Sequence, residues 1–271
     1  FADTIKSDRL ENYFFAPYTF YKETWVKLGG YDSVFRQSRC DSDLVQRCMR
    51  LGIKLTQTFA ANVYHFTCVS SRGIDWFNKQ NQKAQERVQI QHYADQVEMR
   101  RLLRKWGSFN HGEELLTKYD IDLVVSNLTD KHIPHIYGIE PFFTRVWLQS
   151  EELKSKVINV YDRDEIYANY LFGFTEESWK QNRHLYNQLQ LDDVYHTGEP
   201  VDYCIKVELD FNKDNKDLLE NLMNLSKIVE ASEPGLYELG DSTLDIRKLQ
   251  AAIPVCQVIN PPFDSNLLIV E

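Results

Sequence analysis

The chain has 271 residues, of which 43% are hydrophobic and 13% aromatic, and its formal net charge is −9 at pH 7. This composition is sufficient for a globular core and excludes a largely disordered chain. No run of 18 or more apolar residues occurs, so no transmembrane helix is expected. No basic stripe interleaved with aromatic residues occurs either, which argues against nucleic-acid binding.

The cysteines and the first residues bear on the cellular compartment. The five cysteines are odd in number and contain no Cys-x-x-Cys pair: Cys40, Cys48, Cys68, Cys204 and Cys256. This usage fits free thiols in a reducing compartment better than a disulfide framework. The segment that begins at Phe1 is too polar for a signal peptide. We therefore expect a cytoplasmic protein.

Charge is distributed unevenly along the chain. Residues 1–107 carry a net charge of +6, whereas residues 108–271 carry −15. Such a change predicts a domain boundary near Gly107, with residues 108–114 as a linker and residues 115–271 as an acidic second domain.

The first 107 residues alternate between short strands and helices. Apolar periodicity and helix-stop signals place the elements. The expected strands are residues 11–20 (broken at Pro17), 54–59 and 62–66. The expected helices are residues 22–28 (ended by Gly29), 41–51 (ended by Gly52) and about 74–105. The last helix is rich in polar residues, so we expect it to lie across the surface or to pack on a partner.

The most informative stretch joins a double-glycine turn to an acidic helix start and a histidine. Its members are Gly29, Gly30, Tyr31, Asp32, Asp41, Asp43, Arg47 and His65. Adjacent glycines permit positive φ and let a ligand approach the backbone closely. A carboxylate at a helix start is favoured by the helix dipole, and when ionised it can act as a general base.

Structural roles for the same residues stay open. The two glycines can simply cap the preceding helix. Asp41 or Asp43 can be an ordinary N-cap, and Asp43 can form an i,i+4 salt bridge with Arg47.

The combination resembles the acceptor-side half of the inverting glycosyltransferases of family 2, which have the GT-A fold. The residues that carry the resemblance lie within about 11–107: Phe14-Phe15-Ala16, Trp25, Gly29-Gly30-Tyr31-Asp32, Asp41-Ser42-Asp43-Leu44, Arg47, Gly52, His65 and Arg104-Lys105-Trp106-Gly107. The resemblance implies that Asp41 is the catalytic base and that His65 is a ligand of a divalent cation, Mn²⁺ or Mg²⁺. It also implies substrate binding by the following residues: Gly29, Gly30, Tyr31, Asp32 and Asp43.

Two features depart from the family pattern. Cys40 replaces the acid that usually precedes the catalytic base, and the Asp-x-Asp motif with its nucleotide-binding half is expected before Phe1. We therefore expect the chain to be a fragment of a longer protein. Asp120-Ile-Asp122 and Asp162-Arg-Asp164 have the same spacing, but they lie downstream, and so short a motif recurs by chance.

Residues 115–271 predict a compact α/β or α+β domain that resembles no family. Its expected strands are 121–127, 143–149, 157–161, 201–211, 236–239 and 244–246, and its expected helices are 132–143, 165–172, 176–189 and 216–231. The ligand-type side chains of Asp130, His132, His135 and Glu140 are closely spaced, but a proline between the histidines disfavours a zinc site. A group of aromatic residues is either a sugar-binding face or core: Tyr161, Tyr167, Tyr170, Phe172 and Phe174.

Two functions of different class follow. The first is an inverting glycosyltransferase, or a fragment of one, that transfers a sugar from a nucleotide-sugar donor to a glycan or other hydroxyl acceptor. The mildly basic first part suits an anionic donor. The second is a non-catalytic binding or assembly module derived from a glycosyltransferase, favoured by the missing Asp-x-Asp motif and by Cys40. A homo-oligomer is also expected, because half of a GT-A sheet would expose an edge.

Overall fold

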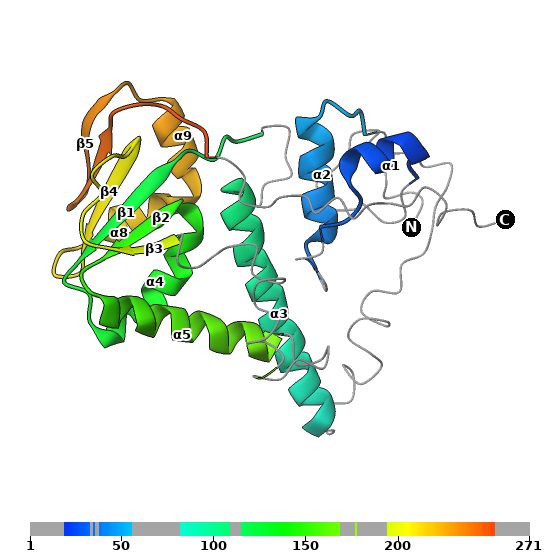
Figure 1. Ribbon diagram of the computed structural model, residues 1–271, viewed down its shortest axis with the longest axis horizontal. Helices are drawn as coiled ribbons and strands as arrows, with labels where there is room; N and C mark the ends of the chain where they lie inside the picture. The colour runs from blue at the N-terminus through cyan, green and yellow to red at the C-terminus, as the bar shows by residue number, and fades with distance from the viewer. Residues whose placement is uncertain are drawn as a thin grey trace, which may run out of the picture.

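The computed structural model describes residues 19–32, 35, 38–55, 82–108, 115–168, 177 and 194–252. Within these residues, the helices α1 to α3 precede a six-stranded, mostly parallel sheet that carries its own helices (Figure 1). The predicted mixed α/β class is therefore confirmed. The expected strand 62–66 lies outside the described residues, as do most of the strands 11–20 and 54–59 and most of the linker.

Glycines in the left-handed conformation follow the first two helices, as predicted. α1 (Lys22–Leu28) ends at Gly29, whose φ is 75°. α2 (Cys40–Arg50) is followed by Gly52, whose φ is 67°. A small apolar cluster joins the two helices through Leu28, Leu44 and Cys48.

The acidic start of α2 differs from an ordinary capped helix. Arg39 occupies the N-cap position in the left-handed conformation, with φ of 62° and no side-chain cap bond. Asp41 and Asp43 lie in the first turn instead. The possibility that either carboxylate is the N-cap is therefore wrong, whereas both remain close to the positive end of the helix dipole.

The long polar helix is not a surface helix along its C-terminal half. In α3 (Gln82–Trp106), residues 101–106 are all buried, including Arg101, Arg104 and Lys105. α3 contacts α2 on one side, and α5 and η4 of the sheet unit on the other. The surface expectation fails there because partners inside the molecule receive these charges, which periodicity alone does not reveal.

The sheet is built around β1, in the strand order β3-β2-β1-β4-β6-β5. The strands are β1 (Ile121–Ser126), β2 (Arg145–Leu148), β3 (Tyr195–Thr197), β4 (Ile205–Asp210), β5 (Gly235–Leu239) and β6 (Ser242–Ile246). β3, β2, β1 and β4 are parallel, whereas β6 is antiparallel to both β4 and β5. Parallel neighbours require crossover connections, and the helices of this unit provide them.

The crossover helices follow the sequence expectation with some exceptions. Between β1 and β2 lie η3 (Asp130–His132), α4 (Ile133–Ile139) and η4 (Glu140–Phe142); α5 (Glu151–Ala168) follows β2; and α8 (Lys216–Asn221), η6 (Leu222–Asn224) and α9 (Leu225–Glu230) follow β4. The predicted strand 157–161 is wrong, because Val157 and Tyr161 lie one turn apart on the buried side of α5. β3, with three residues, was too short to predict.

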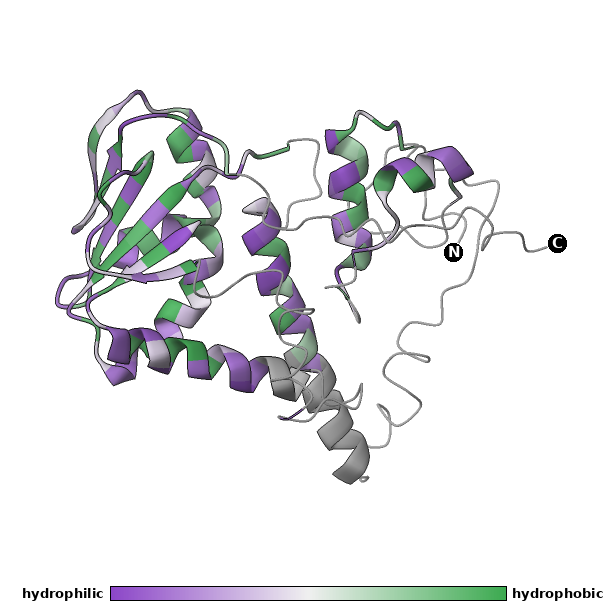
Figure 2. Ribbon diagram, in the orientation of Figure 1, coloured by the Kyte–Doolittle hydropathy of each residue, from purple (hydrophilic) through white to green (hydrophobic). Residues whose placement is uncertain are grey.

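Apolar residues gather on one face of the sheet. Ile121, Leu123 and Val125 of β1 belong to the main core, with residues of α4, α5, α8 and α9. Figure 1 shows α4, α8 and α9 behind the strands, and Figure 2 shows hydrophobic and hydrophilic residues alternating along them. Among the described residues, the helices thus cover a single face.

Charged residues occupy the opposite face. Asp122 of β1 is fully buried there, and Arg145 donates to it from Nε at 2.7 Å. The same guanidinium contacts Asp120 at 3.2 Å, and the Trp147 indole donates to Asp122 at 2.9 Å. The acids of the downstream Asp-x-Asp sequence therefore share one arginine.

The described residues bear on whether a helix spans a membrane and on the cysteines. No helix in the described parts of the chain is long and apolar enough to cross a membrane. Three of the five cysteines are described, and Cys40, Cys48 and Cys204 are all free thiols.

Candidate functional site

The double-glycine turn closes α1 and leads directly into Tyr31. Gly29 and Gly30 have φ of 75° and 71°, a conformation that costs little only for glycine. Their N–H groups donate to the carbonyls of Val26 and Trp25 at 3.0 and 3.3 Å. The turn therefore caps the helix, which was one of the two interpretations of the sequence. The backbone conformation alone explains why glycine is needed at both positions, without any ligand.

The loop before α2 is fastened to α3. The backbone N–H and the hydroxyl of Ser38 both donate to the Glu98 carboxylate, at 2.5 and 3.1 Å. Arg39 donates to Asp95 at 3.1 Å. These contacts hold Arg39 in its left-handed conformation and thereby set where the first turn of α2 begins.

Asp41 lies half-buried in that first turn. The Cys40 thiol is 3.8 Å from its Oδ1. Burial raises the pKa of Asp41 above its ordinary value, and the thiol contact lowers it by a smaller amount. A carboxylate with a raised pKa accepts a proton more readily, which suits general base catalysis.

Tyr31 and Cys40 both respond electrostatically to Asp41. Burial, followed by the negative charge of Asp41, raises the pKa of the Tyr31 phenol. The same two causes raise the pKa of Cys40 to about 11, so the thiol stays neutral at pH 7. Tyr31 is 47% exposed, and its ring meets the edge of Trp25 at 5.3 Å between centroids. An exposed aromatic ring thus lies close to a basic carboxylate.

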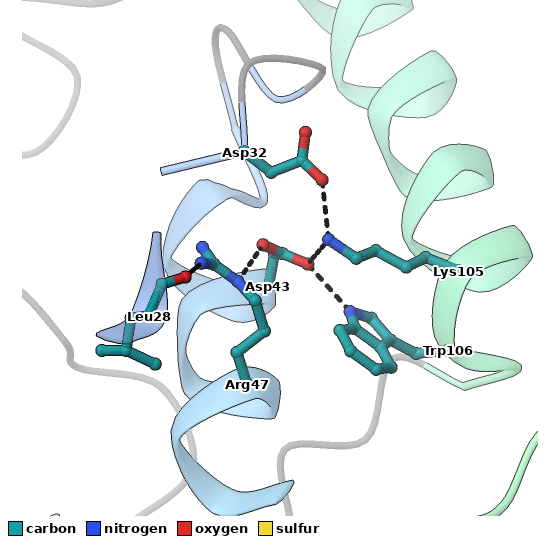
Figure 3. A network of polar contacts seen from close by, with 6 residues as sticks. All are labelled: Leu28, Asp32, Asp43, Arg47, Lys105 and Trp106. Carbon is teal, nitrogen blue, oxygen red and sulfur yellow. Dashed lines mark hydrogen bonds and ion pairs between the residues drawn. The ribbon is translucent and has the colours of Figure 1, made fainter. Parts of the chain in front are cut away.

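Asp43 is the centre of a buried polar network instead of an exposed site. Its side chain is fully buried, with Oδ2 accepting from Arg47 Nε at 2.9 Å and Oδ1 lying 2.6 Å from Lys105 Nζ. The Trp106 indole donates to the same Oδ1 at 2.9 Å. Figure 3 shows the carboxylate between the Arg47 guanidinium and the Lys105 ammonium group. The predicted i,i+4 pair with Arg47 is confirmed.

Asp32 joins this network from the double-glycine turn. Lys105 Nζ lies 2.6 Å from its carboxylate, and both side chains are 1% exposed (Figure 3). Arg47 also donates from Nη1 to the carbonyl of Leu28, just before the turn. The network therefore connects α1, the turn, α2 and the end of α3, and it fixes the position of the turn relative to Asp41.

Apart from the two glycines of the turn, the structure divides the predicted site residues into three groups. Asp41 and Tyr31 are accessible and close together. Asp32 and Asp43 are held inside the protein by cations. His65 lies outside the described residues, so its predicted role as a metal ligand stays a prediction. No group of three or more histidine, cysteine or acidic side chains suited to a metal occurs in the described part of the chain.

Three residues that help to build this site were given no individual role by the sequence analysis. Lys105 and Trp106 appeared there only as part of a family-like ending, and Glu98 did not appear. Lys105 and Trp106 contact Asp43, and Glu98 binds the loop before α2. A signal was present in the sequence, because charged residues interrupt the apolar stripe near the end of α3. Their partners lie more than fifty residues away.

No family model, curated protein or solved structure shows a significant match to this chain.

Three of the four closely spaced histidines and acids of 130–140 have separate partners. His132 stacks on Phe211 with 4.4 Å between ring centroids and takes part in a capping box with Thr129. Asp130 pairs with Lys156 at 2.8 Å. Glu140 is fully buried against arginines of α3. Asp130, His132 and Glu140 therefore make three separate contacts, and His135 is exposed.

Proposed function

We propose that the chain is part of an inverting glycosyltransferase, with residues 11–107 as the acceptor-side half of a GT-A fold. The observation that carries the proposal is the environment of Asp41, a half-buried carboxylate in a helical first turn whose pKa burial raises. The sequence pattern shared with family 2 glycosyltransferases supports it. The left-handed turn at Gly29 and Gly30 and the exposed ring of Tyr31 support it further.

In this proposal Asp41 removes the proton from an acceptor hydroxyl. The oxygen then attacks the anomeric carbon of the donor sugar, the bond to the nucleoside diphosphate breaks, and the configuration at that carbon inverts. Tyr31 offers a ring on which an acceptor sugar can stack beside the base. A divalent cation, when bound, would neutralise the leaving diphosphate, and His65 is its predicted ligand in this chain.

A transfer assay of the full-length protein with a panel of nucleotide sugars tests the role of Asp41. Asp41→Asn removes the base with almost no change in size, and we expect turnover to fall by about 100- to 10,000-fold. Asp202→Asn serves as the control, because Asp202 is an exposed carboxylate just before β4 and takes no part in positioning Asp41. Equal turnover of wild type and Asp41→Asn would contradict the base assignment.

Donor binding is measured separately by thermal unfolding of the 271-residue chain with UDP, GDP and dTDP, each with and without Mn²⁺. A metal-dependent rise in melting temperature for one nucleotide would identify the donor class. If no nucleotide raises the melting temperature, this chain carries only the acceptor side of the enzyme.

The alternative is a non-catalytic binding or assembly module derived from a glycosyltransferase. The engagement of Asp32 and Asp43 in internal ion pairs favours it, because two of the predicted substrate residues then act in stability. The transfer assay of the full-length protein separates the two functions: the alternative requires that the folded full-length protein turn over no nucleotide sugar.

A further inference from the structure

Two arginines of α3 are buried beside the sheet unit with a single carboxylate between them. Glu140 Oε1 accepts from Arg100 Nη2 at 2.5 Å and from Arg104 Nη2. The side chains of Arg104 and Glu140 are 3% and 0% exposed, and that of Arg100 is 11% exposed. Because two guanidinium groups share one carboxylate, this contact retains one uncompensated positive charge.

Tyrosines surround the two guanidinium groups. The Arg100 guanidinium lies 3.2 Å from the centroid of the Tyr137 ring, and the Tyr161 ring is 5.5 Å from each arginine. Tyr195 of β3 is fully buried and electrostatically coupled to both arginines. We call these six residues the arginine–tyrosine cluster: Arg100, Arg104, Tyr137, Glu140, Tyr161 and Tyr195.

The cluster holds more donors than acceptors. Nε and Nη1 of both arginines and the Tyr195 hydroxyl are buried without a hydrogen-bond partner among the described residues, and on the acceptor side so is Glu140 Oε2. Buried polar atoms normally have a partner, and such atoms in a folded protein indicate a bound water or ion. The excess of donors and the positive charge together favour an anion.

Two pKa shifts bear on the charge of this region. Burial raises the pKa of Tyr195 to about 12, so its hydroxyl remains a donor at neutral pH. Burial also lowers the pKa of Arg104, which means that its charged form lacks solvation that an anion would supply.

We propose that the arginine–tyrosine cluster binds a phosphate-type oxyanion, either free phosphate or the terminal group of a phosphomonoester. Its oxygens accept from the remaining N–H groups of Arg100 and Arg104, whose planar forks match phosphate geometry. A monoprotonated phosphate also carries one P–OH donor, which suits Glu140 Oε2. Arg100, whose side chain is 11% exposed, is the more accessible of the two arginines. The site is separate from Asp41 and does not depend on the proposed transferase activity.

Thermal unfolding of the whole chain tests the proposal. Inorganic phosphate and glycerol phosphate are titrated against sodium chloride at equal ionic strength, and sodium sulfate provides an oxyanion that carries no proton at neutral pH. We expect a saturable rise of about 5–10 °C when phosphate reaches a hundred times its Kd, with a smaller rise in sulfate. A larger effect of glycerol phosphate than of phosphate would identify an ester as the ligand. Melting temperatures that follow only the ionic strength would overturn the proposal.

Variants connect the effect to the cluster. Arg100→Gln removes one fork, and Arg100→Lys keeps the charge without the fork, so the lysine variant remains informative if the glutamine variant does not fold. We expect each to raise the apparent Kd for phosphate at least about tenfold. Arg163→Gln removes an arginine that is 70% exposed on α5 and should leave the Kd unchanged. Equal phosphate affinity in wild type and Arg100→Lys would assign the binding to another place.

Discussion

Replacing Asp43 by asparagine removes one negative charge from a buried group of two carboxylates and two cations. The side chains of Asp32, Asp43, Lys105 and Arg47 are between 0% and 6% exposed. In the wild type the four charges balance. In the variant Lys105 keeps Asp32 at 2.6 Å, but Arg47 loses its carboxylate at 2.9 Å, and one positive charge is left without compensation in the interior.

The expected cost follows from this imbalance. Removing one partner of a buried ion pair typically destabilises a protein by about 3–5 kcal/mol, because the remaining charge stays desolvated. The asparagine Oδ1 can still accept from the Trp106 indole, so the loss comes mainly from the charge. We therefore expect Asp43→Asn to lower the free energy of unfolding by about 3–5 kcal/mol at pH 7.

Urea denaturation at pH 7 measures this loss, with the slope of the free energy against urea compared between variants. Asp95→Asn is the matched control, because the Arg39–Asp95 pair is 3.1 Å long with both side chains about 30% exposed. A pair this accessible contributes less than about 1 kcal/mol. If Asp43→Asn costs no more than Asp95→Asn, the network in Figure 3 does not stabilise the fold in the way described.

Four further variants test backbone strain and titration. Gly29→Ala should lower the free energy of unfolding, measured in urea, by about 1–2 kcal/mol, because φ at Gly29 is 75°. Gly138→Ala in α4 should raise it by about 0.4–1 kcal/mol, because an added Cβ there meets nothing within 4 Å. Burial raises the pKa of Asp122, and Arg145 opposes that rise. Arg145→Leu should therefore lower the free energy of unfolding most at neutral pH, where Asp122 is ionised. A loss of stability that does not shrink as acid protonates Asp122 would contradict this. Since burial also raises the pKa of Asp41, its ionised form weakens the fold. Asp41→Asn should accordingly be at least as stable as wild type at pH 7, with its advantage vanishing below about pH 4, and the acid limb of the wild-type rate profile should lie above 3.8.

Several local elements could be predicted because their signals are local. Gly29 ends α1 at the predicted residue, since only glycine adopts φ near 75° cheaply where a helix stops. The predicted strands 121–127, 236–239 and 244–246 correspond to β1, β5 and β6 with boundaries shifted by a residue or two. The helical pattern of 216–231 was also correct, although the structure divides it into α8, η6 and α9. Turns, periods and breakers act over a few residues, so they can be read without the fold.

The roles of charged residues could not be read in the same way. Asp41 and Asp43 are two residues apart in one helical turn and have the same side chain. They differ in burial and pairing because Lys105 and Trp106, more than sixty residues later in the chain, contact Asp43. The polarity of α3 suggested a surface position for Arg100 and Arg104, but in the structure both arginines pair with Glu140. Burial and ion pairing depend on which segments become neighbours, and this long-range information is absent from local patterns.

The sequence by itself determined the mixed α/β class, the helix ends at glycines and the motif that resembles a glycosyltransferase acceptor site. Tertiary structure alone decided which carboxylates face solvent and which become buried ion pairs. It also decided that the sheet order is β3-β2-β1-β4-β6-β5 and that two arginines share one glutamate. The physical reason is that backbone conformation follows from near neighbours, whereas desolvation and charge pairing are set by contacts between residues far apart in the chain.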